Sequence, residues 1–65
     1  MKTYVYRIDF ESADGSNWGW ELVEAKTVDE AIWIFRQEYR KEVYNITDVL
    51  RRIGKESGKE IWKNR

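Results

Sequence analysis

Residues 27–35, Thr27-Val28-Asp29-Glu30-Ala31-Ile32-Trp33-Ile34-Phe35, decide the fold, because this stretch has a helical pattern and lies between segments that resemble strands. Thr27 is a typical helix N-cap, and Glu30 follows three residues later, where its side chain can return a hydrogen bond to the backbone. Apolar residues recur at helical spacing from here onward: Val28, Ala31, Ile32, Phe35 and Tyr39. The pattern predicts one amphipathic helix that begins at Thr27 and ends near Glu42.

Two strands are expected before the helix. Residues 4–10 alternate with period two, which is typical of a strand with one buried face; the apolar set is Tyr4, Tyr6, Ile8 and Phe10. Asp14-Gly15 is a hairpin signal, and residues 18–26 should return along the first strand. The apolar residues of this second strand alternate out of phase: Trp18, Trp20 and Leu22 on one face, Val23 and Ala25 on the other. We therefore expect a β-bulge near Glu21-Leu22.

The segment after the helix is expected to form a second hairpin. Residues 44–55 predict a strand, although Asp48–Ile53 could instead form a short helix capped by Thr47. Ser57-Gly58 predicts a tight turn into a last strand at residues 59–63. The sequence thus predicts a single α+β domain over residues 1–65, with the order ββαββ, in which one helix packs on a four-stranded antiparallel sheet made of two hairpins.

Composition argues against an enzyme. The 65 residues include no His and no Cys, which excludes Ser-His-Asp and Cys-His catalysis and the usual zinc sites. No glycine-rich phosphate-binding motif occurs. We therefore expect no catalytic residues, no cofactor and no metal. No run of 18 apolar residues and no signal-peptide pattern is present, so a soluble, cytoplasmic protein without a membrane partner is the expectation.

Trp33 and Ile34 lie off the apolar stripe of the predicted helix. At 100° per residue, Trp33 is about 140° from the centre of the stripe and Ile34 is about 120° away on the other side. The pair could form an exposed anchor for a partner, since Trp is enriched at binding hot spots. Two other readings stay open: Trp33 packs over the sheet edge or along its own helix, or it lies at a homodimer interface.

Trp18 and Trp20 flank Gly19 at the start of the second strand. One interpretation places both rings in the core beneath the helix. The other treats them as an exposed aromatic platform, for a protein groove or for stacking nucleic-acid bases.

Charge balances over the whole chain but not along it. Residues 1–30 carry 3 basic and 7 acidic residues, a net charge of −4, and residues 31–65 carry 9 basic and 5 acidic residues, a net charge of +4. Ordinary solvated faces could account for this. Alternatively, the acidic first hairpin could meet a basic groove on another protein, or the basic second hairpin could bind nucleic-acid phosphates.

Residues 23–32, Val23-Glu24-Ala25-Lys26-Thr27-Val28-Asp29-Glu30-Ala31-Ile32, follow a short hairpin and lead into the helix and a strand such as Tyr44-Asn45-Ile46. Over residues 4–53 this arrangement resembles small accessory proteins of phages, prophages and conjugative elements, including DpnD/PcfM-type domains. Some phage proteins of this size are anti-CRISPR inhibitors. The resemblance implies a mobile-element protein that binds a host enzyme stoichiometrically, and it assigns no site residue.

Two hypotheses follow, and both describe a monomer or homodimer. The first is a non-enzymatic protein-binding module, an anti-CRISPR-like inhibitor that binds a host nucleic-acid-processing enzyme, such as a nuclease complex, and blocks its substrate. Its predicted contact residues are Trp33, Ile34, Trp18, Glu11, Asp14 and Glu21. The alternative is a small nucleic-acid-binding protein that uses the C-terminal hairpin. Its predicted contact residues are Arg51, Arg52, Lys55, Lys59 and Trp62.

Overall fold

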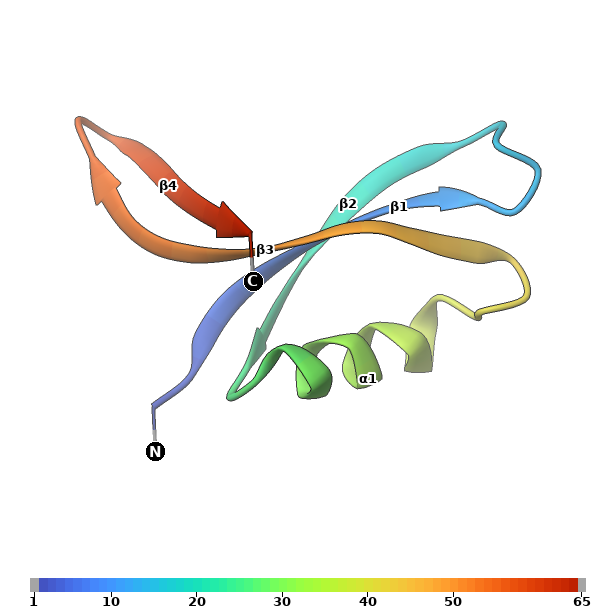
Figure 1. Ribbon diagram of the computed structural model, residues 1–65, viewed down its shortest axis with the longest axis horizontal. Coiled ribbons are helices and arrows are strands. Elements are labelled where there is room, and N and C mark those ends of the chain that lie inside the picture. The colour runs from blue at the N-terminus through green and yellow to red at the C-terminus, as the bar shows by residue number, and fades with distance from the viewer. Residues whose placement is uncertain (1, 65) are drawn as a thin grey trace.

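The computed structural model describes residues 2–64, in which one helix lies against one face of a four-stranded antiparallel sheet (Figure 1). The elements are β1 (Tyr4–Ser12), β2 (Trp18–Ala25), α1 (Val28–Glu38), β3 (Tyr44–Glu56) and β4 (Lys59–Asn64). The strands lie in the order β2-β1-β3-β4. This arrangement confirms the predicted ββαββ α+β fold, and it confirms that Asp48–Ile53 is strand.

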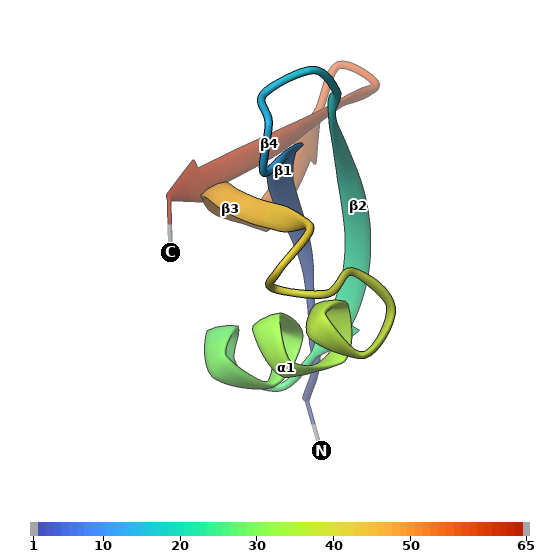
Figure 2. The ribbon, with the colours of Figure 1, turned by 90° about the vertical axis from the view of Figure 1, so that its right-hand side faces the viewer.

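The helix starts where the cap residues predict. The Glu30 backbone N–H donates to Thr27 Oγ1 (3.1 Å), and Glu30 Oε1 accepts from the Lys26 backbone N–H (3.0 Å). The buried residues of the helix are Ala31 and Phe35, which pack onto β1 and β2. Figure 2 shows α1 along one side of the sheet only. The opposite side of the sheet is therefore left without a covering layer.

The helix ends at Glu38, earlier than the predicted end near Glu42. Tyr39 adopts an extended conformation (φ −109°, ψ 97°). Its ring stacks on Phe35 with centroids 4.6 Å apart, and its hydroxyl donates to Glu21 on β2 (2.7 Å). The backbone N–H groups of Val43 and Tyr44 then donate to the Arg40 carbonyl, which closes a turn into β3. Tertiary contacts of Tyr39 thus end the helix before its sequence pattern does.

The prediction of a bulge in β2 is wrong. β1 and β2 pair without interruption from Tyr4–Ala25 to Glu11–Trp18. Regular alternation points Val23 and Ala25 toward the helix, and both are buried. Gly19 also faces the helix, where a Cβ would lie 3.5 Å from the Phe10 ring. Because one helix covers one face, the other apolar set of β2 lies on the uncovered face: Trp18, Trp20 and Leu22.

The irregularities occur in β3 instead. Asp9 pairs with Asp48 and Phe10 with Ile46, so Thr47 is an extra residue on β3. This bulge reverses the alternation of β3. Both Val49, on one side of the bulge, and Ile46, on the other, consequently pack into the core. A second shift leaves Ile53 unpaired between the Arg52–Trp62 and Gly54–Ile61 pairs.

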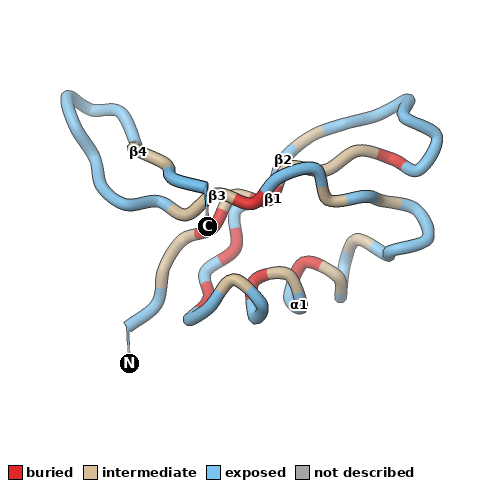
Figure 3. Tube along the Cα trace, in the orientation of Figure 1, coloured by how far each residue is buried: buried red, intermediate tan, exposed pale blue. Residues whose placement is uncertain are grey.

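The β3–β4 hairpin extends past the helix and is mostly exposed (Figure 3). The core is confined to the centre of the molecule, where β1, β2, β3 and α1 meet: Tyr6, Ile8, Val23, Ala25, Ala31, Phe35 and Val49. The structure therefore has two surfaces without a covering helix, the far face of the whole sheet and the near face of the β3–β4 hairpin.

Candidate interaction surface

The face of the sheet that points away from α1 is here called the open face. Strand register and alternation place its residues in rows across the sheet. One row is Leu22, Arg7, Leu50 and Asn64; the next is Trp20, Asp9 and Asp48; the third is Trp18, Glu11 and Asn45. The remaining residues of this face lie beyond the first row, on its other side: Val5, Glu24, Arg52, Lys55, Glu60 and Trp62. The open face thus combines three tryptophans with a set of charged residues.

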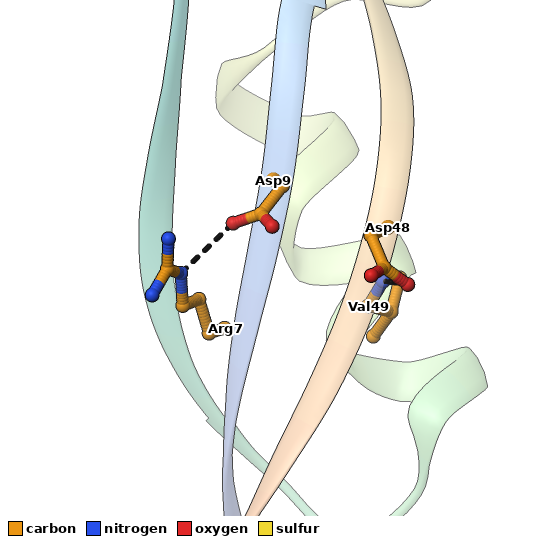
Figure 4. Close-up of polar contacts among 4 residues, drawn as sticks. All are labelled: Arg7, Asp9, Asp48 and Val49. Atoms are coloured by element: carbon orange, nitrogen blue, oxygen red, sulfur yellow. Dashed lines mark hydrogen bonds and ion pairs between the residues drawn. The ribbon is translucent and has the colours of Figure 1, made fainter. Parts of the chain in front are cut away.

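Two of these tryptophans are unusually exposed. Trp18 is 82% exposed and Trp20 is 53% exposed, and they lie two residues apart on the edge strand β2. The Arg7 guanidinium lies over the Trp20 ring, 5.0 Å from its centroid. Arg7 Nε also donates to Asp9 Oδ1 (2.9 Å; Figure 4). Arg7 therefore holds the Trp20 ring and the Asp9 carboxylate close to each other on the sheet surface.

The open face is acidic. Its acids are Asp9, Glu11, Glu24, Asp48 and Glu60, and its bases are Arg7, Arg52 and Lys55, so five negative and three positive charges give a net charge of −2. Arg7 pairs with Asp9, and Arg52 lies 3.8 Å from Glu60. Asp48 Oδ1 accepts a hydrogen bond from the Val49 backbone N–H (2.9 Å; Figure 4). An apolar and aromatic surface bordered by carboxylates attracts positively charged surfaces.

The structure divides the six predicted partner-binding residues among several places. Trp18 and Glu11 are direct cross-strand partners on the open face. Trp33 and Ile34 lie on exposed parts of α1, and Trp33 is 63% exposed. Since α1 packs on the opposite face of the sheet, one flat partner surface cannot contact Trp18 and Trp33 together.

The two remaining acids are engaged within the chain. Asp14 Oδ1 accepts from the Ser12 hydroxyl (2.6 Å), the Ser16 hydroxyl (2.7 Å) and the Ser16 backbone N–H (3.0 Å). These bonds, that from Ser12 above all, lower the pKa of Asp14 to about 2. Glu21 accepts from the Tyr39 hydroxyl on the helix side, and this hydrogen bond is the main cause that raises the pKa of Tyr39 to about 12. The Asp14 carboxylate thus stabilises the turn between β1 and β2, and the Glu21 carboxylate connects β2 to the end of the helix.

The five residues of the nucleic-acid alternative also separate. Arg51 and Arg52 point to opposite faces of β3: Arg51 lies over the Tyr4 ring, 4.7 Å from its centroid, whereas Arg52 lies near Glu60 on the open face. Trp62 is the cross-strand partner of Arg52. Lys55 and Lys59 lie at the exposed end of the hairpin, where their cross-strand partners are Glu60 and Glu56. These residues do not form one continuous basic surface.

Sequence reasoning missed several residues of the open face: Arg7, Asp9, Leu22, Asp48 and Leu50. The signal was present, because the alternation of residues 4–10 already assigns Arg7 and Asp9 to the polar side of β1. The period-two spacing of Trp18, Trp20 and Leu22 assigns these three to that side as well, once β2 is regular. The bulge expected in β2 hid the fact that these residues of β1 and β2 lie on the same side of the sheet.

Comparisons with protein-family models, curated proteins and solved structures found no match. Within residues 2–64, no group of three or more acidic, His or Cys side chains is arranged to hold a metal ion. The helix of the described chain is too short and too polar to cross a membrane. The open face is accordingly interpreted from its own geometry and charge.

Proposed function

We propose that this chain is a non-enzymatic protein-binding module whose docking surface is the open face of its sheet. The observation that carries the proposal is the pair of exposed rings, Trp18 and Trp20, on a face whose net charge is −2. Large aromatic side chains are frequent binding hot spots, and carboxylates around them steer a partner of opposite charge. The occupant is therefore a partner protein that presents a basic surface.

Charge separates this proposal from base stacking on the same tryptophans. A single strand that stacked on Trp18 and Trp20 would bring its phosphates near Glu11, Asp9 and Asp48. Like charges repel, and single-strand binding sites combine aromatic rings with a positively charged groove. The open face has the rings without that groove.

A mobile-element inhibitor is the specific form of this function that we propose. Enzymes that process nucleic acids carry basic grooves for phosphates, and an acidic face with aromatic anchors complements such a groove. Occupation of the groove would exclude the substrate without any catalytic residue in the inhibitor. This form rests on charge complementarity and on the resemblance to phage and plasmid accessory proteins.

The first test is direct titration of the purified protein with labelled single- and double-stranded DNA and RNA at about 50 and 200 mM salt. The proposal expects no saturable binding. Micromolar binding that collapses at the higher salt would instead support the nucleic-acid alternative, and charge reversal at Arg51 and Lys59 would then abolish it.

The second test is capture from a bacterial lysate with the wild type and three single variants, Trp18→Ala, Trp20→Ala and Trp33→Ala. The expected partner is retained by the wild type and by Trp33→Ala but is lost with Trp18→Ala or Trp20→Ala, and it binds again when both proteins are purified. Each open-face variant should weaken the purified complex by about 2 kcal/mol or more. Loss with Trp33→Ala alone would move the docking surface to α1 and overturn the proposal.

A further inference from the structure

A pocket lies on the helix side of the sheet beside Val28, the first residue of α1. The β3–β4 hairpin diverges from the helix here (Figure 1). This pocket has a volume of about 320 Å³ and is lined by Tyr6, Val28, Arg51, Lys63 and Asn64. It lies on the face of the sheet opposite the open face. Of its lining residues, Asn64 at the end of β4 also belongs to a row of the open face, and the other four do not.

One row across the sheet explains how the pocket forms. Val23, Tyr6, Arg51 and Lys63 are successive cross-strand partners on β2, β1, β3 and β4. The helix packs over Val23 and Tyr6, which are buried. Arg51 and Lys63 lie beyond the helix and form the basic wall of the pocket.

Arg51 and Lys63 are like charges placed directly opposite each other on paired strands. Such a pair is destabilising unless an anion lies between the two groups. Within residues 2–64 no carboxylate lies within 4.0 Å of either side chain, because the ion pairs there join Arg7 to Asp9 and Arg52 to Glu60. Two cations thus line a pocket without a counterion from the described chain.

Tyr6 adds a hydroxyl group to the pocket. Its side chain is 4% exposed and lines the pocket. Of the tyrosine hydroxyls in the described chain, that of Tyr39 donates to a side chain, whereas that of Tyr6 has no hydrogen-bond partner among residues 2–64. No side-chain oxygen or nitrogen of the described residues is both fully buried and unpaired, so the Tyr6 hydroxyl is open enough to bond an acceptor in the pocket that Tyr6 lines.

Arg51 is also held in place. Its guanidinium lies 4.7 Å from the centroid of the Tyr4 ring, and Lys2 Nζ lies 5.8 Å from the same centroid. The first helical turn carries two acids, Asp29 and Glu30, and Glu30 accepts a hydrogen bond from the Lys26 backbone N–H. The Tyr4 ring thus positions the Arg51 guanidinium before any ligand binds.

We propose that this pocket binds a tetrahedral phosphate dianion, as inorganic phosphate or as the phosphate group of a monoester. The guanidinium of Arg51 is suited to two parallel hydrogen bonds to phosphate oxygens, and the Lys63 ammonium supplies a second positive charge. The Tyr6 hydroxyl and the Asn64 amide supply neutral donors. The site is independent of the proposed protein-binding function, since Arg51, Lys63 and Tyr6 lie on the other face of the sheet.

The test is titration of the ¹⁵N-labelled protein with inorganic phosphate at constant ionic strength, with sodium chloride as the compensating salt. Saturable shifts of the Arg51 and Lys63 amides are expected with phosphate and not with chloride. Lys63→Gln should lower the affinity at least about tenfold, since it removes a charge-assisted bond. Tyr6→Phe keeps the buried ring and should lower the affinity about threefold.

Lys59→Gln is the matched control, because it removes the same charge from the same strand at the distant end of the hairpin. It should leave phosphate affinity unchanged. Equal losses with Lys59→Gln and Lys63→Gln would mean general attraction to a basic hairpin and would overturn the site, as would the absence of saturable shifts. Parallel titrations with O-phosphoserine and a nucleoside 5′-monophosphate then show which monoester the pocket accepts.

Discussion

Asp9 on β1 and Asp48 on β3 are direct cross-strand partners on the open face, and Arg7 pairs with Asp9 alone (Figure 4). Two carboxylates in this position repel each other. Asp48 uses one oxygen to accept the Val49 backbone N–H next to the bulge at Thr47. The centre of the open face thus keeps a negative charge that the fold does not neutralise.

Replacing Asp48 by Asn should therefore stabilise the protein. The amide oxygen can still accept from Val49, while the repulsion with Asp9 is removed, and we expect a gain of about 0.5 kcal/mol in the free energy of unfolding. Urea denaturation at low ionic strength measures it, and added salt should reduce the difference. Arg7→Gln, which leaves both carboxylates without a cation, should change stability in the opposite direction. A loss of stability in Asp48→Asn would mean that the repulsion is negligible.

Phe35 and Trp33 are large side chains on one helix with opposite surroundings. Phe35 is 2% exposed and packs against Phe10 and Tyr39, whereas Trp33 is 63% exposed. Phe35→Ala should cost about 3–5 kcal/mol, enough to unfold much of a chain of this size. Trp33→Ala should stay within about 0.5 kcal/mol of the wild type. Circular dichroism and urea unfolding compare the two; unfolding of Trp33→Ala would show that Trp33 belongs to the core.

The hydrogen bond from Tyr39 to Glu21 predicts that the protein loses stability at alkaline pH. It raises the pKa of Tyr39 from 10.0 to about 12, so the folded state holds the phenolic proton more tightly than the unfolded state. The stabilisation is present below pH 10 and is lost as the pH rises toward 12. Absorbance of the phenolate follows this titration. Glu21→Gln should return the Tyr39 pKa toward its ordinary value, while Glu24→Gln, on the opposite face of β2, should leave it raised.

The lowered pKa of Asp14 predicts that stability changes with pH in the opposite direction at the acid end. The Ser12 and Ser16 hydrogen bonds lower its pKa from 3.8 to about 2, so they stabilise the first turn above pH 3.8 and are lost as the pH falls toward 2. Carboxyl ¹³C chemical shifts report this pKa. Ser16→Ala should raise the pKa of Asp14, because the substitution removes the Ser16 hydroxyl donor but keeps the backbone N–H donor. An unchanged pKa in that variant would assign the effect to Ser12 and to the backbone.

The order of the elements was predictable from local signals. Thr27 and Glu30 mark the start of α1, and Asp14-Gly15 and Ser57-Gly58 mark the two turns. Local signals failed where a distant partner decides the outcome. Tyr39 leaves the helix to contact Glu21, eighteen residues earlier. The bulge at Thr47 depends on how β3 aligns with β1, which no pattern within residues 44–53 reveals.

The candidate surfaces were predictable only in part. For Trp18 and Trp20 the sequence left two readings open, a place in the core beneath the helix and an exposed platform, and both rings are exposed. Asp14 and Glu21 looked like free surface acids until their hydrogen bonds were visible. The pairing of Arg51 with Tyr6 requires the strand order β2-β1-β3-β4, which two adjacent hairpins do not determine. The pairing of Arg51 with Lys63 depends on the register shift at Ile53.

That strand order also shapes how the chain reaches its fold. The first strand in sequence is an interior strand of the sheet, and one of its edges stays unpaired until β3 arrives from beyond the helix. Pairing of Ser12 with Tyr44 closes a loop that contains β2 and α1. Loop closure costs entropy before the contacts it allows can form, so this step should limit the folding rate, whereas the β3–β4 hairpin forms locally. Until then, β1 exposes the edge on which another chain could add a strand.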